Sequence, residues 1–119
     1  MHREDIKPGL RDQRDIVVEE RNTVSHTRTP VLSTPQMISM MERVAMDLTQ
    51  RYLPAGSTTV GYEVHIRHKA PAPLGSTVTV SSRLLEVDGR RLLFEVRATQ
   101  GEKIIGEGFH RRTIIQIPE

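Results

Sequence analysis

The sequence contains no cysteine in its 119 residues. This absence excludes disulfide bonds, thiolate metal sites and a cysteine nucleophile. It fits a reducing compartment, and we expect a cytoplasmic location. Long apolar runs are missing too, so no segment is expected to span or anchor in a membrane. Residues 1–11 mix both charge signs, and we do not expect them to act as a signal peptide.

Aromatic residues make up only 3% of the chain, which leaves few stacking platforms for nucleic acid. The formal net charge is +2, a weak bias carried mainly by arginine. We therefore expect no nucleic-acid partner, because a phosphorylated small molecule explains a few arginines equally well. The arginines considered for such a contact are Arg90, Arg91, Arg111 and Arg112.

The length fits a single domain over residues 1–119. Hydrophobic residues form 36% of the chain and charged residues 27%, which is typical of a globular protein. A chain of this size buries only a small core, and oligomerisation would supplement its stability.

One helix is predicted after Ser33-Thr34-Pro35, where either hydroxyl can cap and proline is tolerated in the first turn. Gln36 completes a capping-box pattern with Ser33. The helix is expected to end near Tyr52. Apolar side chains recur along it on one stripe, which predicts one buried face. They are Met37, Ile38, Met41, Val44, Ala45 and Leu48.

Strand patterns surround this helix. A first strand is predicted over residues 13–24, and four more follow the helix over residues 59–68, 76–87, 91–99 and 103–117. Asp88-Gly89 and Gln100-Gly101 predict tight turns, and a break in phase near Leu84 indicates a bulge. Short connections favour antiparallel neighbours. We predict an α+β fold, with one helix against a five-stranded antiparallel sheet.

Three polar residues occupy positions where apolar ones are expected. His68 continues the inward row of Val60, Tyr62, Val64 and Ile66, and it can act as an acid or base or simply end a strand. Glu42 flanks the helical stripe, where a carboxylate is either a nucleophile or base, or a boundary residue with a solvated head. Thr34 is a helix cap or lies beside amides that suit a developing negative charge.

Gly61 interrupts the strand that carries His68, which indicates a bulge, a close approach by a ligand or simply a weak strand position. The five histidines lack the close paired spacing of a zinc motif, so no metal is expected. No nucleophile elbow or phosphate-cradling glycine loop is present either.

The order and spacing of several runs carry a further indication. They are Val31–Glu42, Tyr52–Gly56, Thr59–Gly61, His68–Gly75, Val87–Leu92 and Gly106–Arg112. Together they resemble the fluoroacetyl-CoA thioesterase-like family of hot-dog proteins. The resemblance covers nearly the whole chain from Lys7 onward.

The resemblance implies a hot-dog fold, in which the sheet wraps a central helix and two subunits pair. It implies that Thr34, Glu42 and His68 act together in one pocket on a coenzyme A thioester. Gly61 matches the glycine near the thioester carbonyl, and Arg112 matches an arginine late in the last strand. No cofactor is implied beyond the coenzyme A of the substrate.

One departure concerns the segment before the helix, residues 26–30. It is short and has no phenylalanine, whereas the family enzyme carries phenylalanines that cover the pocket. We therefore expect a small or medium acyl group rather than fluoroacetyl selectivity.

A hot-dog protein that binds acyl-CoA without hydrolysing it is the main alternative. A hydratase is a third, but its closely spaced aspartate and histidine are missing. The dimer can pair further into a tetramer.

Overall fold

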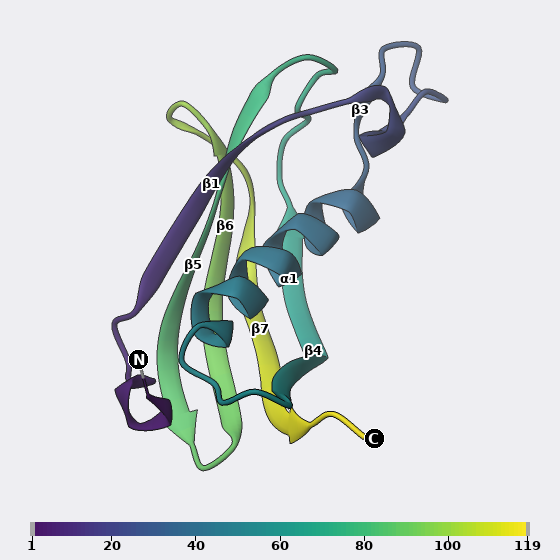
Figure 1. Ribbon diagram of the computed structural model, residues 1–119. Helices are drawn as coiled ribbons and strands as arrows, with labels where there is room; N and C mark the ends of the chain where they lie inside the picture. Colours follow the sequence, from purple (N-terminus) through teal and green to yellow (C-terminus); the bar gives the residue numbers. More distant parts are fainter. Residues whose placement is uncertain (1, 119) are drawn as a thin grey trace.

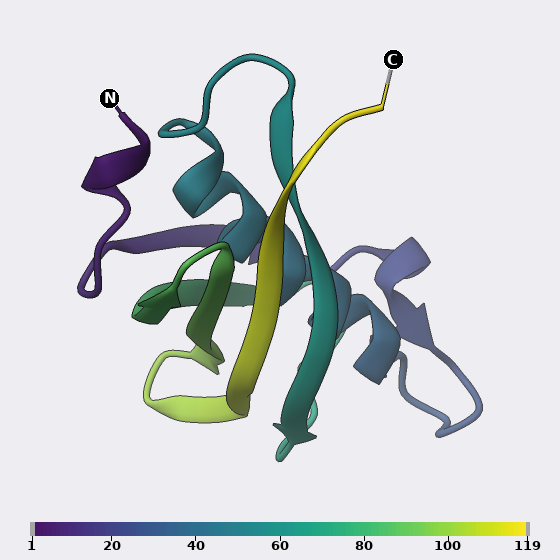
Figure 2. The same ribbon diagram turned by 90° about the horizontal axis from the view of Figure 1, so that it is seen from below.

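A single helix lies across the concave face of a five-stranded antiparallel sheet in the computed structural model (Figures 1 and 2). The structure describes residues 2–118; Met1, at the start of the charged N-terminal stretch, and Glu119 lie outside the described residues. The strands of the sheet run in the order β1-β5-β6-β7-β4. This arrangement confirms the predicted α+β hot-dog architecture. The elements of the sheet are β1 (Arg11–Val17), β4 (Ser57–His68), β5 (Thr77–Asp88), β6 (Arg91–Gln100) and β7 (Lys103–Gln116).

The first strand is shorter than predicted. β1 ends at Val17, and a 3-10 turn over Glu20–Asn22 follows. The Asn22 side chain accepts a hydrogen bond from the Glu19 amide at 2.9 Å, so local turn chemistry outweighs the apolar run. The chain then forms a separate two-stranded ribbon from β2 (Thr23–Val24) and β3 (Val31–Leu32).

The helix α1 (Thr34–Gln50) forms where its capping signal predicts. Ser33 is the N-cap, and its hydroxyl accepts a hydrogen bond from the Gln36 amide at 3.2 Å. Thr34 is therefore the first helical residue, and its hydroxyl is not used as the cap. The predicted apolar stripe is buried, with Ile38 half-buried at its margin. Within residues 2–118, no helix is long and apolar enough to cross a membrane.

The strand β4 is an edge of the sheet. The short turn after it predicts pairing with β5, but β4 pairs with β7 instead. The amides of Lys69 and Ala70 bond to the Ile105 carbonyl, which carries the chain past β7 and away from a hairpin. The other two predicted turns do form hairpins, and Gly89 and Gly101 both have the positive φ of 59° that glycine adopts without strain.

A β-bulge in β4 changes which side chains face the helix. Gly61 pairs with Arg112 and Glu63 pairs with Arg111, so Tyr62 is an extra residue. Directly paired residues of antiparallel strands share a face of the sheet. The inward row predicted through Val60 and Tyr62 is therefore wrong for those two residues. Gly61 faces the helix before the bulge, and Val64, Ile66 and His68 face it afterwards. The predicted break in β5 is likewise a register shift after Leu84.

Replacing Ser33 by alanine is expected to lower the free energy of unfolding by about 1 kcal/mol, because the Gln36 amide would lose its acceptor. Urea unfolding followed by circular dichroism measures this change. Ser39→Ala, on the exposed side of the same helix, is the matched control and should leave stability unchanged or slightly higher. Equal midpoints for both variants would contradict the capping role.

Candidate active site

Thr34 and His68 meet where the first turn of α1 crosses the end of β4. The Thr34 hydroxyl lies 2.8 Å from Nδ1 of His68. The helix approaches closely here because Gly106, which pairs with His68 in the sheet, has no side chain. A Cβ on Gly106 would lie 2.5 Å from the sulfur of Met37, one turn along the helix. The structure thus brings together two of the three residues predicted to act on substrate.

Burial lowers the pKa of His68 from its ordinary value of 6.5, and the nearby Ala70 backbone opposes part of this shift. The imidazole is therefore neutral near pH 7, the form that accepts a proton. Its Nε2 atom is shielded from solvent and has no hydrogen-bond partner within residues 2–118. One ring nitrogen is thus positioned by Thr34, and the other is left for another group.

Glu42 lies two turns further along α1, above Gly61 of β4. A Cβ on Gly61 would stand 3.1 Å from Oε2 of Glu42 and 3.2 Å from Nη1 of Arg112. It would also stand 2.7 Å from Cε1 of His110, which is closer than packing permits. No side chain would fit here, and we call the narrow gap above Gly61, between the Glu42 carboxylate and the Arg112 guanidinium, the slot.

Arg112 is buried at 5% exposure and is held by main-chain and side-chain oxygens of one residue. Its Nε donates to Oγ1 of Thr59 at 2.7 Å, and its Nη2 donates to the Thr59 carbonyl at 2.8 Å. Burial lowers the pKa of this guanidinium below its ordinary value, and the charge of Glu42 opposes the shift. Even so, Glu42 forms no ion pair within 4.0 Å among residues 2–118, so the two charges face each other across the slot.

His110 and Thr59 complete this second cluster, and the sequence reading missed both. His110 is 1% exposed and lies between the Glu63 carbonyl and Arg112. The available signal was its alternation with Arg112 and Ile114 along the last strand, where two polar residues in a buried row are unusual. Thr59 gave no such signal, because threonine is ordinary in strands.

Within one chain the candidate residues form two separate clusters rather than the expected single pocket. Thr34 and Glu42 are eight residues apart on α1, which is about 12 Å along the helix axis. His68 and Gly61 are seven residues apart on β4, or roughly 20 Å along the strand. No hydrogen bond or ion pair among the described residues joins Glu42 to His68.

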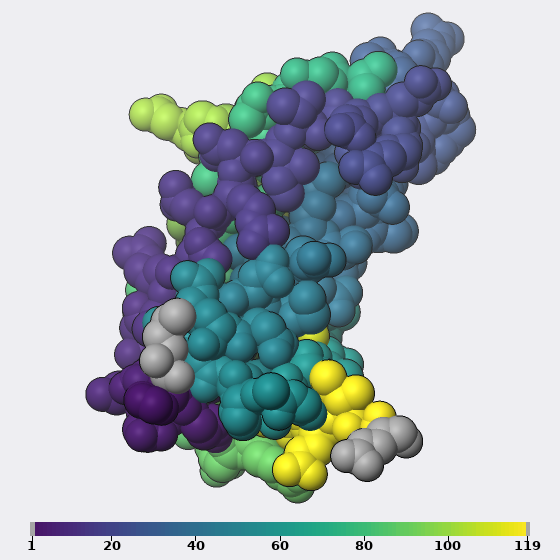
Figure 3. Space-filling view, in the orientation of Figure 1, coloured from purple at the N-terminus to yellow at the C-terminus, as the bar shows by residue number. Residues whose placement is uncertain are grey.

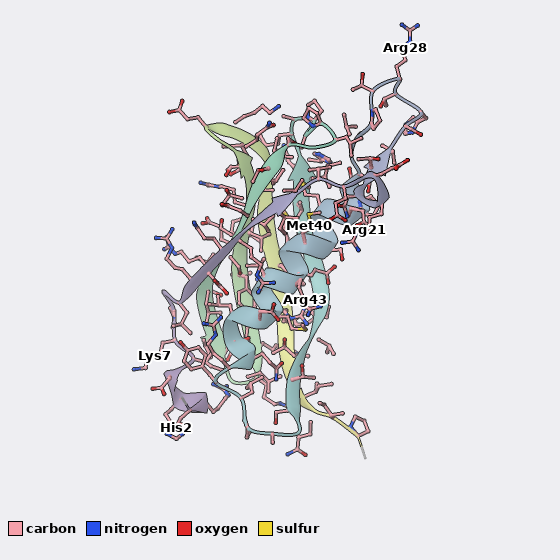
Figure 4. All side chains as sticks on the ribbon, turned by 45° about the horizontal axis from the view of Figure 1, so that its top comes forward. His2, Lys7, Arg21, Arg28, Met40 and Arg43 are labelled. Atoms are coloured by element: carbon pink, nitrogen blue, oxygen red, sulfur yellow. The ribbon has the colours of Figure 1, made fainter. Side chains whose placement is uncertain are left out.

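Each cluster borders a cavity. A cavity of about 780 Å³ lies between β1 and α1 and is lined by Glu42, Arg112, Met40 and Arg43 among others. Figure 4 labels Met40 and Arg43 on the helix, and Figure 3 shows the adjoining surfaces of the helix and of the purple N-terminal segment. A second cavity, of about 530 Å³, is lined by Thr34 and His68 together with the segment before the helix.

The remaining candidate arginines lie away from both clusters. Arg111 is on the outer face of the sheet, where its Nε lies 2.9 Å from the Glu63 carboxylate. Arg91 lines an outer-face cavity together with Arg111. Arg90 is in the turn between β5 and β6, and its carbonyl accepts from Ile114. Of the four arginines, only Arg112 is part of the candidate site.

The family model for fluoroacetyl-CoA-specific thioesterases matches residues 13–117. The chain belongs to this family. A fluoroacetyl-CoA thioesterase from Streptantibioticus cattleyicolor is 34% identical over 121 residues, which cover 94% of this chain and 87% of the relative. The family assignment confirms the resemblance drawn from the sequence.

Solved structures support the same assignment. The structure of a fluoroacetyl-CoA thioesterase has 33% sequence identity and a TM-score of 0.87, and the match covers 94% of this chain and 90% of that one. A mutant of that enzyme, solved in complex with fluoroacetate and CoA, matches at 33% identity with a TM-score of 0.85, over 93% of this chain and 96% of that one. A thioesterase superfamily member from Thermus thermophilus matches at 28% identity with a TM-score of 0.85, over 93% of this chain and 85% of that one.

Stability is expected to fall as the pH drops below about 6.5. Burial lowers the pKa of both His68 and His110, so the unfolded chain binds these protons before the folded chain does. His110→Gln removes one contribution and should reduce the slope by at most about 1.4 kcal/mol per pH unit. Urea unfolding at several pH values between about 5 and 7.5 measures the slope.

His26→Gln is the matched control for this experiment, because His26 is exposed in the segment before the helix. It should leave the pH dependence of unfolding unchanged. An identical slope for wild type and His110→Gln would show that the buried ring does not resist protonation.

Proposed function

We propose that this protein hydrolyses the thioester of a small or medium acyl-CoA, releasing the free acid and CoA, and that it does so as a cytoplasmic homodimer. The observation that carries the proposal is the pair of clusters beside one helix: a carboxylate facing a guanidinium over Gly61, and a neutral imidazole held by Thr34. Family membership supports the same activity. No cofactor is required, because water and these side chains supply the chemistry.

The reaction adds water across the C–S bond. Glu42 either attacks the thioester carbonyl, forming an anhydride that water then opens, or takes a proton from the attacking water. In both cases a C–O bond forms and the C–S bond breaks, and the proton that water gives up passes through His68, which accepts it and then donates it to the thiolate of CoA. Thr34 orients the imidazole of His68. The Gly61 amide and Arg112 would stabilise the charge that develops on the carbonyl oxygen.

A second copy of the chain would join the two clusters. β4 is an unpaired edge that exposes Val60, Tyr62 and Val64 at 41%, 48% and 43%, and an apolar edge strand is a template for pairing. Antiparallel pairing of two β4 strands about a two-fold axis near Val64 extends the sheet. The two β4 strands then run in opposite directions, so the partner's His68 lies close to Gly61 and Glu42 of the first subunit. We infer that each active site uses Glu42 of one subunit and His68 of the other.

The acyl group occupies space next to residues 26–30. His26 and Thr27 of that segment line the cavity beside Thr34 and His68, and the segment contains no phenylalanine. Arg28, at its tip, extends away from the sheet (Figure 4). A pocket closed by small and polar residues has room for acyl groups larger than fluoroacetyl, so we propose a broader acyl range than that name implies.

Replacing Glu42 by glutamine is expected to reduce kcat on short acyl-CoA esters by about 10²–10⁴-fold, because the carboxylate is lost and the shape is kept. Release of free CoA, followed with a thiol reagent over acyl chains of increasing length, measures the rate. Glu102→Gln, on the exposed β6–β7 turn, is the control and should match wild type. Full turnover by Glu42→Gln would overturn the mechanism. Binding of acyl-CoA by wild type without release of thiol would favour the acyl-CoA-binding alternative.

A mixture of two inactive variants tests the shared site. In a heterodimer of Glu42→Gln and His68→Ala subunits, one site carries both changes and the other carries neither. Random assortment of equal amounts should therefore restore about one quarter of wild-type activity. Co-expression with two different affinity tags isolates the heterodimer. If each site were built from a single chain, the heterodimer would be as inactive as its parents.

A further inference from the structure

His110 is a buried histidine whose protonation state is fixed by its two partners. Its Nδ1 lies 2.9 Å from the Glu63 carbonyl, which only accepts hydrogen bonds, so Nδ1 carries the proton. Its Nε2 lies 3.2 Å from Nη1 of Arg112, and a guanidinium only donates. Nε2 must therefore present its lone pair. The ring is the neutral Nδ1–H tautomer as long as both contacts persist.

The charges that face the ring favour the same state. Arg112 on its own strand opposes protonation, while Glu42 from α1 favours it. The carboxylate of Glu63 is turned to the outer face, where Arg111 pairs with it. Burial acts against the charged form most strongly, and the pKa of His110 lies below its ordinary value.

The bulge in β4 supplies the first of the two partners. Tyr62 is the extra residue, and the carbonyl that follows it, on Glu63, receives the Nδ1 proton. A single main-chain irregularity therefore places Gly61 beside the slot and orients the ring that contacts Arg112. Nη1 is the Arg112 atom nearest the slot, at 3.2 Å from the missing Cβ of Gly61.

We propose that His110 is a positioning residue for the thioesterase reaction: its Nε2 lone pair holds Nη1 of Arg112 back from Glu42 and keeps the slot over Gly61 open. This inference rests on the proposed function. Thr59 accepts from Nε and Nη2 and His110 accepts from Nη1, so the two residues together hold all three nitrogens of the rigid, planar guanidinium. Without an acceptor at Nε2, the whole guanidinium shifts toward α1 until Nη1 donates to the Glu42 carboxylate and occupies the oxygen needed for catalysis.

Two amide variants separate the two contacts of the ring. His110→Gln reaches the Nε2 position and can still accept from Arg112, whereas His110→Asn reaches only the Nδ1 position and keeps the bond to Glu63. We expect His110→Asn to lose about tenfold or more in kcat with little change in KM, since a hydrogen bond to a charged group is lost. His110→Gln should retain most of the wild-type kcat.

Thermal unfolding of both variants shows whether the fold persists. Equal kcat values for the two variants would overturn the proposal. A loss in kcat that correlates with the unfolding temperature, and not with whether the variant retains the contact to Arg112, would also overturn it. Adding His110→Asn to an Arg112→Lys variant provides the second test, because a residue that acts through Arg112 should then cause no further loss in kcat. A full additional tenfold loss in that background would contradict it.

Nitrogen NMR of the wild-type imidazoles tests the arrangement without any turnover. His110 should be the neutral Nδ1–H tautomer from about pH 7 to 8, because burial lowers its pKa and both of its contacts require that form. A protonated ring or an Nε2–H tautomer in that range would refute the proposal. If wild type hydrolysed no acyl-CoA but the NMR result held, the proposed function would fall while the geometry of His110 and Arg112 stood.

Discussion

One extra residue in β4 decides which side chains meet the helix. Residues of a regular strand alternate between faces, so Gly61 and His68, seven positions apart, would point to opposite sides. The bulge at Tyr62 removes this conflict and turns both toward α1. The carboxylate cluster and the imidazole cluster can face the same side of the sheet only because of this irregularity. The bulge disrupts main-chain hydrogen bonds of the sheet locally, but it lies on an edge strand, where one side of the backbone is already unpaired.

Polar residues at the start of α1 and along it have separate roles. Ser33 takes the capping role, so the Thr34 hydroxyl is left for His68. Two turns later Glu42 stands at the margin of the buried stripe, half in the core and half in the cavity beside Arg112. The apolar residues between them, Met37 and Met41, are fully buried and anchor the helix to the sheet. The spacing of the two clusters is therefore set by core packing.

Sequence patterns were sufficient for the helix and for the four strands that follow it. The capping signal, the helical stripe and the glycine turns are local, so their physics is contained in a few neighbouring residues. The pairing of β4 with β7 is not local, and the short turn after His68 pointed to β5 instead. His110 was missed for the same reason. Its partners, Glu63 and Arg112, are a main-chain oxygen far along the sequence and a side chain whose direction depends on the bulge.

The prediction that His68 faces the helix is right, although the alternation predicted along β4 is wrong in part. His68 was placed inward by extending a row through Val60 and Tyr62, and the structure does place it against Thr34. The row itself is broken, because the glycine at position 61 is followed by the extra residue. The glycine inside the strand predicts a bulge. Shifting the alternation by one residue at that bulge places Val60 and Tyr62 on the outer face, as observed.

The opposite edge of the sheet limits how such chains assemble. β1 carries the run Arg11-Asp12-Gln13-Arg14-Asp15, and two of its charges are tied to the helix side through Arg14–Asp47 and Asp12–Arg51. A strand so rich in fixed charge is a poor template for a further strand. Pairing through β4, as proposed above, would use the same edge of both subunits and leave a charged β1 strand at each end of the joined sheet. Those two edges would disfavour further strand addition, and with it growth into a fibre.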